Sequence, residues 1–267
     1  MKILICGDVV GRSGREIVEK EIPKLREKEK IDFVVLNGEN AASGFGITKK
    51  ICQNFYSIGV DVITSGNHIW DQKEILDYIS KDLRLLRPCN FPLNSPGNGY
   101  GTYKINNGKI ICVINVMCRL FMDSLESPFD SVKKIIDLTK SKYNDAIIII
   151  DVHGESTSEK MALAHFFDGQ VNVIFGTHTH VPTADLQILE KGSFFQTDLG
   201  MCGDYDSVIG MKKENSIRKF THKHLKLRLE TASGHGTLSG TIIDINDQDN
   251  SIQGFNQILR GGKLDRI

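Results

Sequence analysis

The sequence predicts an α/β fold whose β-structure is mixed and mostly parallel. Strand-like apolar runs at 3–6, 32–36 and 60–64 are separated by stretches of helical character. Strands joined in this way by helices indicate right-handed crossovers and parallel pairing. The first run, Ile-Leu-Ile-Cys, is apolar at every position, as expected for a strand that is covered on both faces.

Antiparallel strands join this pattern further along the chain. Residues 102–106 and 109–115 flank Asn107-Gly108, which is the strongest short-range signal for a β-hairpin. The most apolar run, at 146–150, predicts a buried strand, and another strand-like run precedes Gly176. The last strands are expected near 193–197, 241–245 and 252–259.

Helices are expected between these strands. The first carries an apolar stripe at helical spacing that includes Ile17, Ile22 and Leu25, and Ser13 is its expected N-cap. The other helices are expected from about 48 and over 130–141 and 157–167.

Size, charge and cysteine content restrict the kind of protein. With 267 residues, we expect a single domain over 1–267, and the loop-rich, charged stretch at about 201–237 is expected to be a cap or flap. Lys plus Arg and Asp plus Glu are equal at 33 each, so net charge gives no argument for nucleic acid or an anionic membrane as a partner. Six cysteines without a Cys-x-x-Cys motif, and no apolar run of transmembrane length, lead us to expect a cytoplasmic protein.

Polar side chains follow five of the predicted strands, each within a few residues of the strand's end. They are Asp8, Glu39, Asn40, Asn67, His68, His153, His178 and His180. Each alone is explained as a turn residue, a solvated charge or a buried histidine. In open α/β sheets, however, ligands bind beyond the carboxyl ends of the strands, so these groups are expected to meet at one edge.

The chemistry of this set points to metal ions. Carboxylates, amide oxygens and imidazoles without a thiolate suit Mn, Fe or Zn, and they disfavour a structural zinc cage. The set is too large for one ion. Two ions about 3.5–4 Å apart are a common arrangement for in-line displacement at phosphorus.

The motifs that carry these residues resemble those of the calcineurin-like metallophosphoesterases over roughly residues 3–200. The matching motifs are Gly7-Asp8, Gly66-Asn67-His68, His153-Gly154 and Gly176-Thr177-His178-Thr179-His180. The chain departs from the broad superfamily at Asp8-Val9-Val10, where Asp-x-His is usual, and at Gly38-Glu39-Asn40, where Gly-Asp is usual. Both departures resemble the narrower YmdB-type family of bacterial phosphodiesterases, and this likeness spans nearly the whole chain.

The resemblance implies a four-layer αββα sandwich of two mixed sheets with a small cap. It also implies an enzyme that hydrolyses 2′,3′-cyclic nucleotides or related RNA-derived phosphate esters through a metal-bridging hydroxide. Two ions, Fe or Mn with Zn as an alternative, are expected. One would be held by Asp8, Glu39, Asn40 and His180, and the other by Glu39, Asn67, His153 and His178. His68 is implied to assist the leaving oxygen, and association into a homo-oligomer is a further expectation.

Two alternative interpretations fit parts of the sequence. The spacing of Gly7, Gly11 and Gly14 imitates a dinucleotide-binding turn, but it is Gly-x-x-x-Gly-x-x-Gly, and Asp8 would repel a pyrophosphate. The basic segment at 212–228 indicates either a solvated hairpin or a nucleic-acid surface. An RNA-binding regulatory protein with a vestigial or secondary phosphatase site is therefore the alternative of a different class.

Overall fold

The computed structural model describes residues 1–222, 224 and 226–265, so Lys223 and Leu225 of the basic segment lie outside the described residues. The first sheet contains β1 (Lys2–Cys6), β3 (Phe33–Asn37), β4 (Val62–Thr64), β12 (Leu238–Ile245) and β13 (Ile252–Arg260). The second contains β5 (Tyr100–Lys104), β6 (Ile110–Met117), β7 (Ile147–His153), β8 (Val173–Thr177), β9 (Gln187–Ile188) and β10 (Phe194–Gln196). A small third sheet pairs β2 (Asp8–Val9) with β11 (Met201–Cys202).

The strand order in the first sheet is β13-β12-β1-β3-β4, and in the second it is β5-β6-β7-β8-β10-β9. The central neighbours β1, β3 and β4 are parallel, as are β6, β7, β8 and β10. Antiparallel strands flank them, which confirms the predicted mixture. The expected hairpin joins β5 to β6 with Lys104 opposite Ile110, and Gly108 adopts a positive φ of 86° in its turn.

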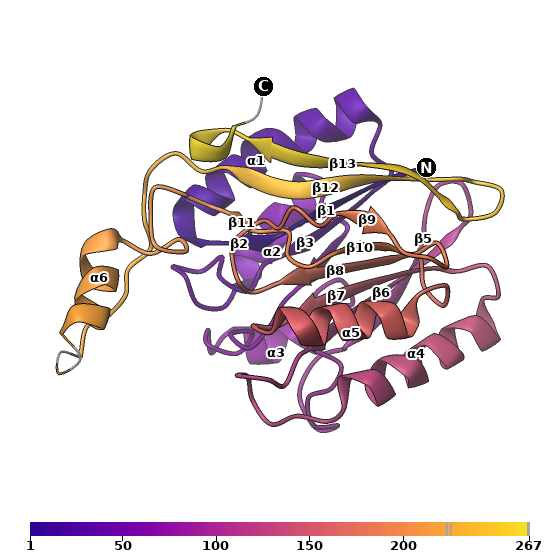
Figure 1. Ribbon diagram of the computed structural model, residues 1–267, viewed down its shortest axis with the longest axis horizontal. Coiled ribbons are helices and arrows are strands. Elements are labelled where there is room, and N and C mark those ends of the chain that lie inside the picture. The colour runs from indigo at the N-terminus through magenta and orange to yellow at the C-terminus, as the bar shows by residue number, and fades with distance from the viewer. Residues whose placement is uncertain (223, 225, 266–267) are drawn as a thin grey trace.

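Successive side chains of a strand point to opposite faces of its sheet, and this alternation separates the core into layers. Ile3 and Ile5 of β1 pack in a cluster with Ile149 and Val173 of the second sheet, whereas Leu4 packs in a different cluster with α1. The two sheets therefore face each other across the first cluster, and helices cover their outer faces (Figure 1). The four-layer sandwich implied by the resemblance is confirmed.

The helices are α1 (Gly11–Glu29), α2 (Lys49–Ser57), α3 (Ile75–Ile79), α4 (Pro128–Lys142), α5 (Thr157–Phe167) and α6 (Lys213–Thr221), with a 3₁₀ turn at η1 (Gly262–Leu264). The first three contribute to the core on the first sheet, and α4 and α5 to the core on the second. Of the helices that the structure describes, none combines the length and hydropathy required to cross a membrane.

Two expectations about local structure are wrong. Ser13 does not cap α1, because the helix begins two residues earlier at Gly11, and the buried Ser13 hydroxyl instead donates to the carbonyl of Ala232 (3.3 Å). The solvated hairpin expected at 212–228 is not formed, because this basic segment contains the helix α6. This helix projects away from the sandwich (orange in Figure 1).

Candidate metal centre

The carboxyl ends of β1, β3, β4, β7 and β8 lead to one cluster of polar side chains. Asn37, the last residue of β3, donates to Asp151 Oδ2 of β7 (3.0 Å) and so joins the two sheets directly beneath it. The predicted ligands lie on the segments that follow these strands. His153 itself is the last residue of β7.

The ring nitrogen Nε2 of His153 is the point on which three other predicted ligands converge. It lies 3.2 Å from Glu39 Oε1 and 3.2 Å from Asn67 Oδ1. His178 Nδ1 lies 3.1 Å from the same nitrogen. These four residues are the set implied for the second ion, and ligand atoms of Glu39, His153 and His178 all lie within 4.8 Å of one another.

Hydrogen bonds outside the cluster determine where His153 carries its proton. Thr177 Oγ1 donates to Asp151 Oδ1 (2.7 Å), so it accepts from His153 Nδ1 (2.9 Å). In the neutral ring, the proton is therefore on Nδ1 and the lone pair on Nε2 points into the cluster.

His178 is oriented in the same way but with its nitrogens reversed. Its Nε2 lies 3.2 Å from Glu155 Oε2, and the negative charge of this carboxylate favours a proton on Nε2 and the lone pair on Nδ1. Burial opposes protonation of His153, but the adjacent Glu39 and Asp8 outweigh it and raise the pKa of His153 to about 9. With that proton displaced by a cation, both imidazoles and the oxygens of Glu39 and Asn67 would direct lone pairs at one place. A cation satisfies this arrangement, and an outer acceptor on each histidine is typical of metal sites.

The set implied for the first ion shows a similar pattern. His180 Nδ1 donates to the carbonyl of Ile209 (2.8 Å), which leaves Nε2 facing Asn40 Oδ1 at 3.2 Å. Asn40 Nδ2 donates to Gly44 (3.0 Å), which fixes the amide so that its oxygen faces the histidine. Asp8 Oδ1 is buried without a hydrogen-bond partner among the described residues. An orphaned carboxylate oxygen beside two lone pairs also fits a cation.

Burial and the neighbouring charges strongly shift the pKa values of the side chains in the cluster. Burial raises the pKa of Asp8 to about 7, although His180 and His153 oppose the rise. Burial acts in the same direction on Glu39, but the adjacent His153 outweighs it and brings the pKa of Glu39 down to about 2. Burial and the nearby His153 lower the pKa of His178 to about 3. Such opposed shifts within one cleft are typical of functional sites.

The backbone that presents the two histidines after β8 is strained. His178 has a φ of 100° and His180 a φ of 65°, both in the left-handed region that side chains other than glycine rarely adopt. Backbone strain of this kind persists only where surrounding contacts hold it.

A buried ion pair supplies such contacts. Lys160 Nζ lies 2.8 Å from Asp198 Oδ2, and both side chains are fully buried. Lys160 also donates to the carbonyl of Thr177 (2.6 Å), and Asp198 accepts from the backbone N–H of Thr179 (3.1 Å). The pair thus binds the peptide groups on both sides of His178.

Sequence reasoning missed Lys160 and Asp198, although one of them left a signal. Lys160, Leu163, Ala164 and Phe167 form the buried face of α5, so the lysine occupies an apolar stripe. A lysine is almost never fully buried unless it is paired. Its partner lies 38 residues away and could not be read from the helix alone.

Gly66 completes the wall of the cluster. A Cβ at this position would collide with Glu39 Oε2 and His153 Nε2. Only glycine lets the backbone pass so close to the converging ligand atoms.

The side chain of His68 lies beside the cluster rather than within it. Its Nδ1 donates to Asp71 Oδ2 (2.8 Å), and its ring meets that of Phe45 edge-on at 5.1 Å between centroids. The backbone N–H of His68 points at Glu39 Oε2 (3.4 Å). The ring is thereby fixed at the edge of the site.

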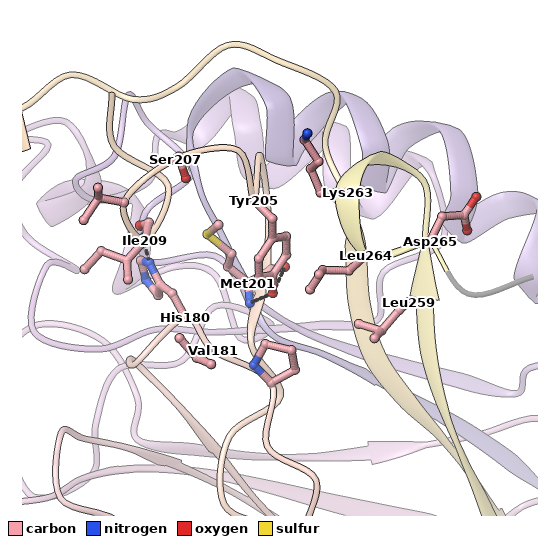
Figure 2. A pocket seen from close by; sticks show the side chains of 12 residues that line it. His180, Val181, Met201, Tyr205, Ser207, Ile209, Leu259, Lys263, Leu264 and Asp265 are labelled. Carbon is pink, nitrogen blue, oxygen red and sulfur yellow. Dashed lines mark hydrogen bonds between the residues drawn. The ribbon is translucent and has the colours of Figure 1, made fainter. Parts of the chain in front are cut away.

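Two cavities meet at His180. The larger, of about 810 Å³, is lined by residues such as Tyr205, Lys263 and Leu264 (Figure 2). Of the predicted site residues, only His180 is among the described residues that line it. The smaller, of about 380 Å³, opens on five of the predicted residues: Glu39, Asn40, His68, His178 and His180. The hydrogen bond from His180 to Ile209, drawn in Figure 2, belongs to the wall between them. The smaller cavity is therefore the one that serves the cluster.

Solved structures of other proteins share the whole fold. One is a hypothetical protein from Thermus thermophilus, with a TM-score of 0.91 and 33% identity over 98% of this chain and 100% of that chain. Another is a phosphatase from Mycoplasma pneumoniae, with a TM-score of 0.90 and 34% identity over 98% of this chain and 93% of that chain. The fold and the cluster of ligand atoms define an enzyme of the metallophosphoesterase class, a hydrolase of phosphate esters.

Within that class, the chain belongs to the family of YmdB-like proteins, whose family model matches residues 4–258. The 2′,3′-cyclic-nucleotide 2′-phosphodiesterase of Bacillus subtilis strain 168 is 46% identical over 259 residues, which is 97% of this chain and 97% of that protein. The family expected from the motifs is confirmed.

Proposed function

We propose that this enzyme is a phosphodiesterase that hydrolyses 2′,3′-cyclic nucleotides or related RNA-derived phosphate esters with the help of two metal ions. The convergence of Glu39, Asn67 and His178 on His153 Nε2 is the observation that carries the proposal. The activity named for the Bacillus subtilis relative, which matches almost the full length of the chain, supports the choice of substrate.

The two ligand sets share Glu39. Asp8, Asn40 and His180 would complete the set for one ion, and Asn67, His153 and His178 the set for the other. Oxygen and imidazole donors without thiolate favour Fe or Mn, with Zn as the alternative. When bound, the ions supply positive charge for the phosphate oxygens and lower the pKa of water at the site.

The protein's own residues prepare this site for an anion. Asp8 and Glu39 are the two carboxylates among the proposed ligands, so two divalent ions leave the loaded site net positive. Lys160 neutralises the nearby Asp198, which would otherwise add a buried negative charge. A phosphodiester is thus attracted, and its charge is stabilised as the reaction proceeds.

His68 is proposed as the catalytic acid. Its Nδ1 is engaged with Asp71 at 2.8 Å, which orients the ring and leaves Nε2 to carry the proton that is transferred. Water loses one proton to solvent and its oxygen adds to phosphorus, the bond from phosphorus to the 2′-oxygen breaks, and His68 donates its proton to that oxygen and then regains one from solvent. The product of a 2′,3′-cyclic nucleotide is then a 3′-phosphate.

The experiment that tests this function is an activity panel. Phosphomonoesters, linear diesters and 2′,3′-cyclic nucleotides are offered to the protein with Mn and Fe supplied separately. We expect metal-dependent opening of the cyclic nucleotides to 3′-phosphates. Activity that survives complete removal of metal, or the absence of turnover of every diester with both metals, would contradict the proposal.

The RNA-binding alternative receives less support from the described residues. Lys212 pairs with Glu230 at 2.7 Å, and Lys213 pairs with Asp206 at 2.8 Å, so part of the positive charge of the basic segment is already neutralised. Filter binding of single-stranded RNA at increasing salt separates the two functions. A surface that tracks phosphates loses affinity steeply as salt rises.

A further inference from the structure

The cavity above the metal centre has a second wall, which belongs to α6. Ser216, Lys219 and Phe220 line the cavity of about 380 Å³ on the side of the projecting segment. Glu39, the shared ligand of the proposed metal sites, lines the same cavity. Its volume lies within the range of cavities that hold small molecules.

The helix presents a single face to this cavity. Ser216, Lys219 and Phe220 are spaced i, i+3 and i+4, so their side chains lie next to one another on α6. Ser216 is buried, whereas the ring of Phe220 is 75% exposed and packs in none of the hydrophobic clusters of the described core. Exposed aromatic rings in the wall of a cavity are available for ligand contact.

Polar contacts fix α6 in this position. Lys213, at the start of the helix, pairs with Asp206, and Asn215 Nδ2 donates to the carbonyl of Arg228 (3.1 Å). The helix is therefore tied at its base to the loop before it, and Asn215 ties it to Arg228 in the irregular segment after it.

The two walls differ in chemistry. The wall beneath contains ligand atoms and His68, which suit a phosphate. The wall formed by the projecting segment contributes apolar side chains, namely Met211, Phe220 and Leu229, and one ammonium group on Lys219. A cavity with a phosphate-binding end and an apolar, aromatic end suits a nucleotide better than a simple phosphate ester.

We propose that α6 is the nucleobase-recognition element of the enzyme, with Phe220 stacking on the base and Lys219 pairing with a phosphate oxygen. This inference rests on the proposed function, because it assigns the substrate class of the same site. It also gives the segment 201–237 the role of a cap that selects nucleotides over diesters without a base.

Steady-state kinetics of the Mn-loaded enzyme test the role of Phe220. The substrates are adenosine 2′,3′-cyclic phosphate and ribose 2′,3′-cyclic phosphate, which lacks the base. For Phe220→Ala, we expect KM for the nucleotide to rise roughly 5- to 100-fold, because that is the usual effect of removing one stacking ring. KM for the ribose compound should stay the same, and Phe220→Tyr should behave like the wild type. Ile217→Ala, an exposed position on the same helix but outside the cavity wall, is the matched control.

Substitution of Lys219 is expected to change KM for the two substrates in a different way. Lys219→Gln should raise KM for both substrates, because the phosphate is common to them, whereas Arg218→Gln, which removes the neighbouring charge outside the cavity wall, should not. If Phe220→Ala and Ile217→Ala have the same KM for the nucleotide, the assignment of α6 is wrong.

Binding of adenosine 3′-monophosphate, measured by calorimetry, separates this inference from the proposed reaction. The wild type should bind this nucleotide more tightly than Phe220→Ala does. Failure of the wild type to hydrolyse any cyclic nucleotide rejects the proposed function, whereas no binding, or equal binding by both proteins, rejects the role of α6.

Discussion

Lys160 Nζ and Asp198 Oδ2 lie 2.8 Å apart in an ion pair that is closed to solvent and that holds the peptide groups around His178. Burying two charges is costly, so the pair is expected to serve the geometry of the loop more than the net stability. Removing only one partner leaves the other charge uncompensated.

We therefore expect Lys160→Met to lower the free energy of unfolding by about 3–5 kcal/mol. The measurement is urea denaturation of the metal-free protein. The exposed pair of Lys133 and Asp137 on α4 is the matched control, and Lys133→Met should cost less than about 1 kcal/mol. The double variant Lys160→Met with Asp198→Asn should be more stable than Lys160→Met alone; a further loss would contradict this account.

Gly66→Ala is expected to remove metal binding while leaving the fold intact. The added methyl group occupies the space into which Glu39 and His153 direct their ligand atoms. Metal content by elemental analysis and far-ultraviolet circular dichroism give the two measurements. Gly254→Ala on β13 is the control, because a Cβ there meets open space. A Gly66→Ala protein with normal metal content would show that the ligand atoms do not enclose the ions.

For His68→Ala, we expect metal content to be retained and kcat to fall by roughly 10²- to 10⁴-fold, the usual contribution of a positioned proton donor. His165→Ala, on the exposed side of α5, should keep wild-type turnover. Unaltered turnover in His68→Ala would remove this histidine from the mechanism.

Glu155→Gln tests the orientation of His178. The carboxylate lies 3.2 Å from His178 Nε2 and keeps the lone pair of the other nitrogen directed at the cluster. Loss of such an outer partner typically weakens metal affinity by about 10- to 100-fold. Competition with a chelator measures this affinity, and Glu190→Gln at an exposed turn is the control. Equal affinity in both variants would mean that Glu155 does not orient the ring.

Much of this architecture was predictable because short stretches of the sequence specify its strands and turns. A short apolar run made of β-branched isoleucines, such as the one at 147–150, favours a buried strand. The Asn107-Gly108 turn specifies its hairpin without help from the rest of the chain. The predicted ligands followed from one rule, that parallel strands present the residues after them at a common edge.

The two errors have different causes: a contact between distant residues for the start of α1, and the absence of an apolar stripe for α6. The start of α1 depends on β2, which pairs with β11 almost two hundred residues later, so the local signal at Ser13 was misleading. Charged and polar residues together make up most of the helix α6, and it buries only Ser216, so it lacks the apolar stripe by which helices are recognised.

Two ions that share Glu39 require two ions per chain, and elemental analysis of the purified enzyme tests this most directly. We expect close to two ions per chain in the wild type, and for Glu39→Gln we expect a lower metal content and a large loss of turnover. A wild type that never holds more than one ion per chain, or a Glu39→Gln variant with unchanged turnover, would contradict the claim.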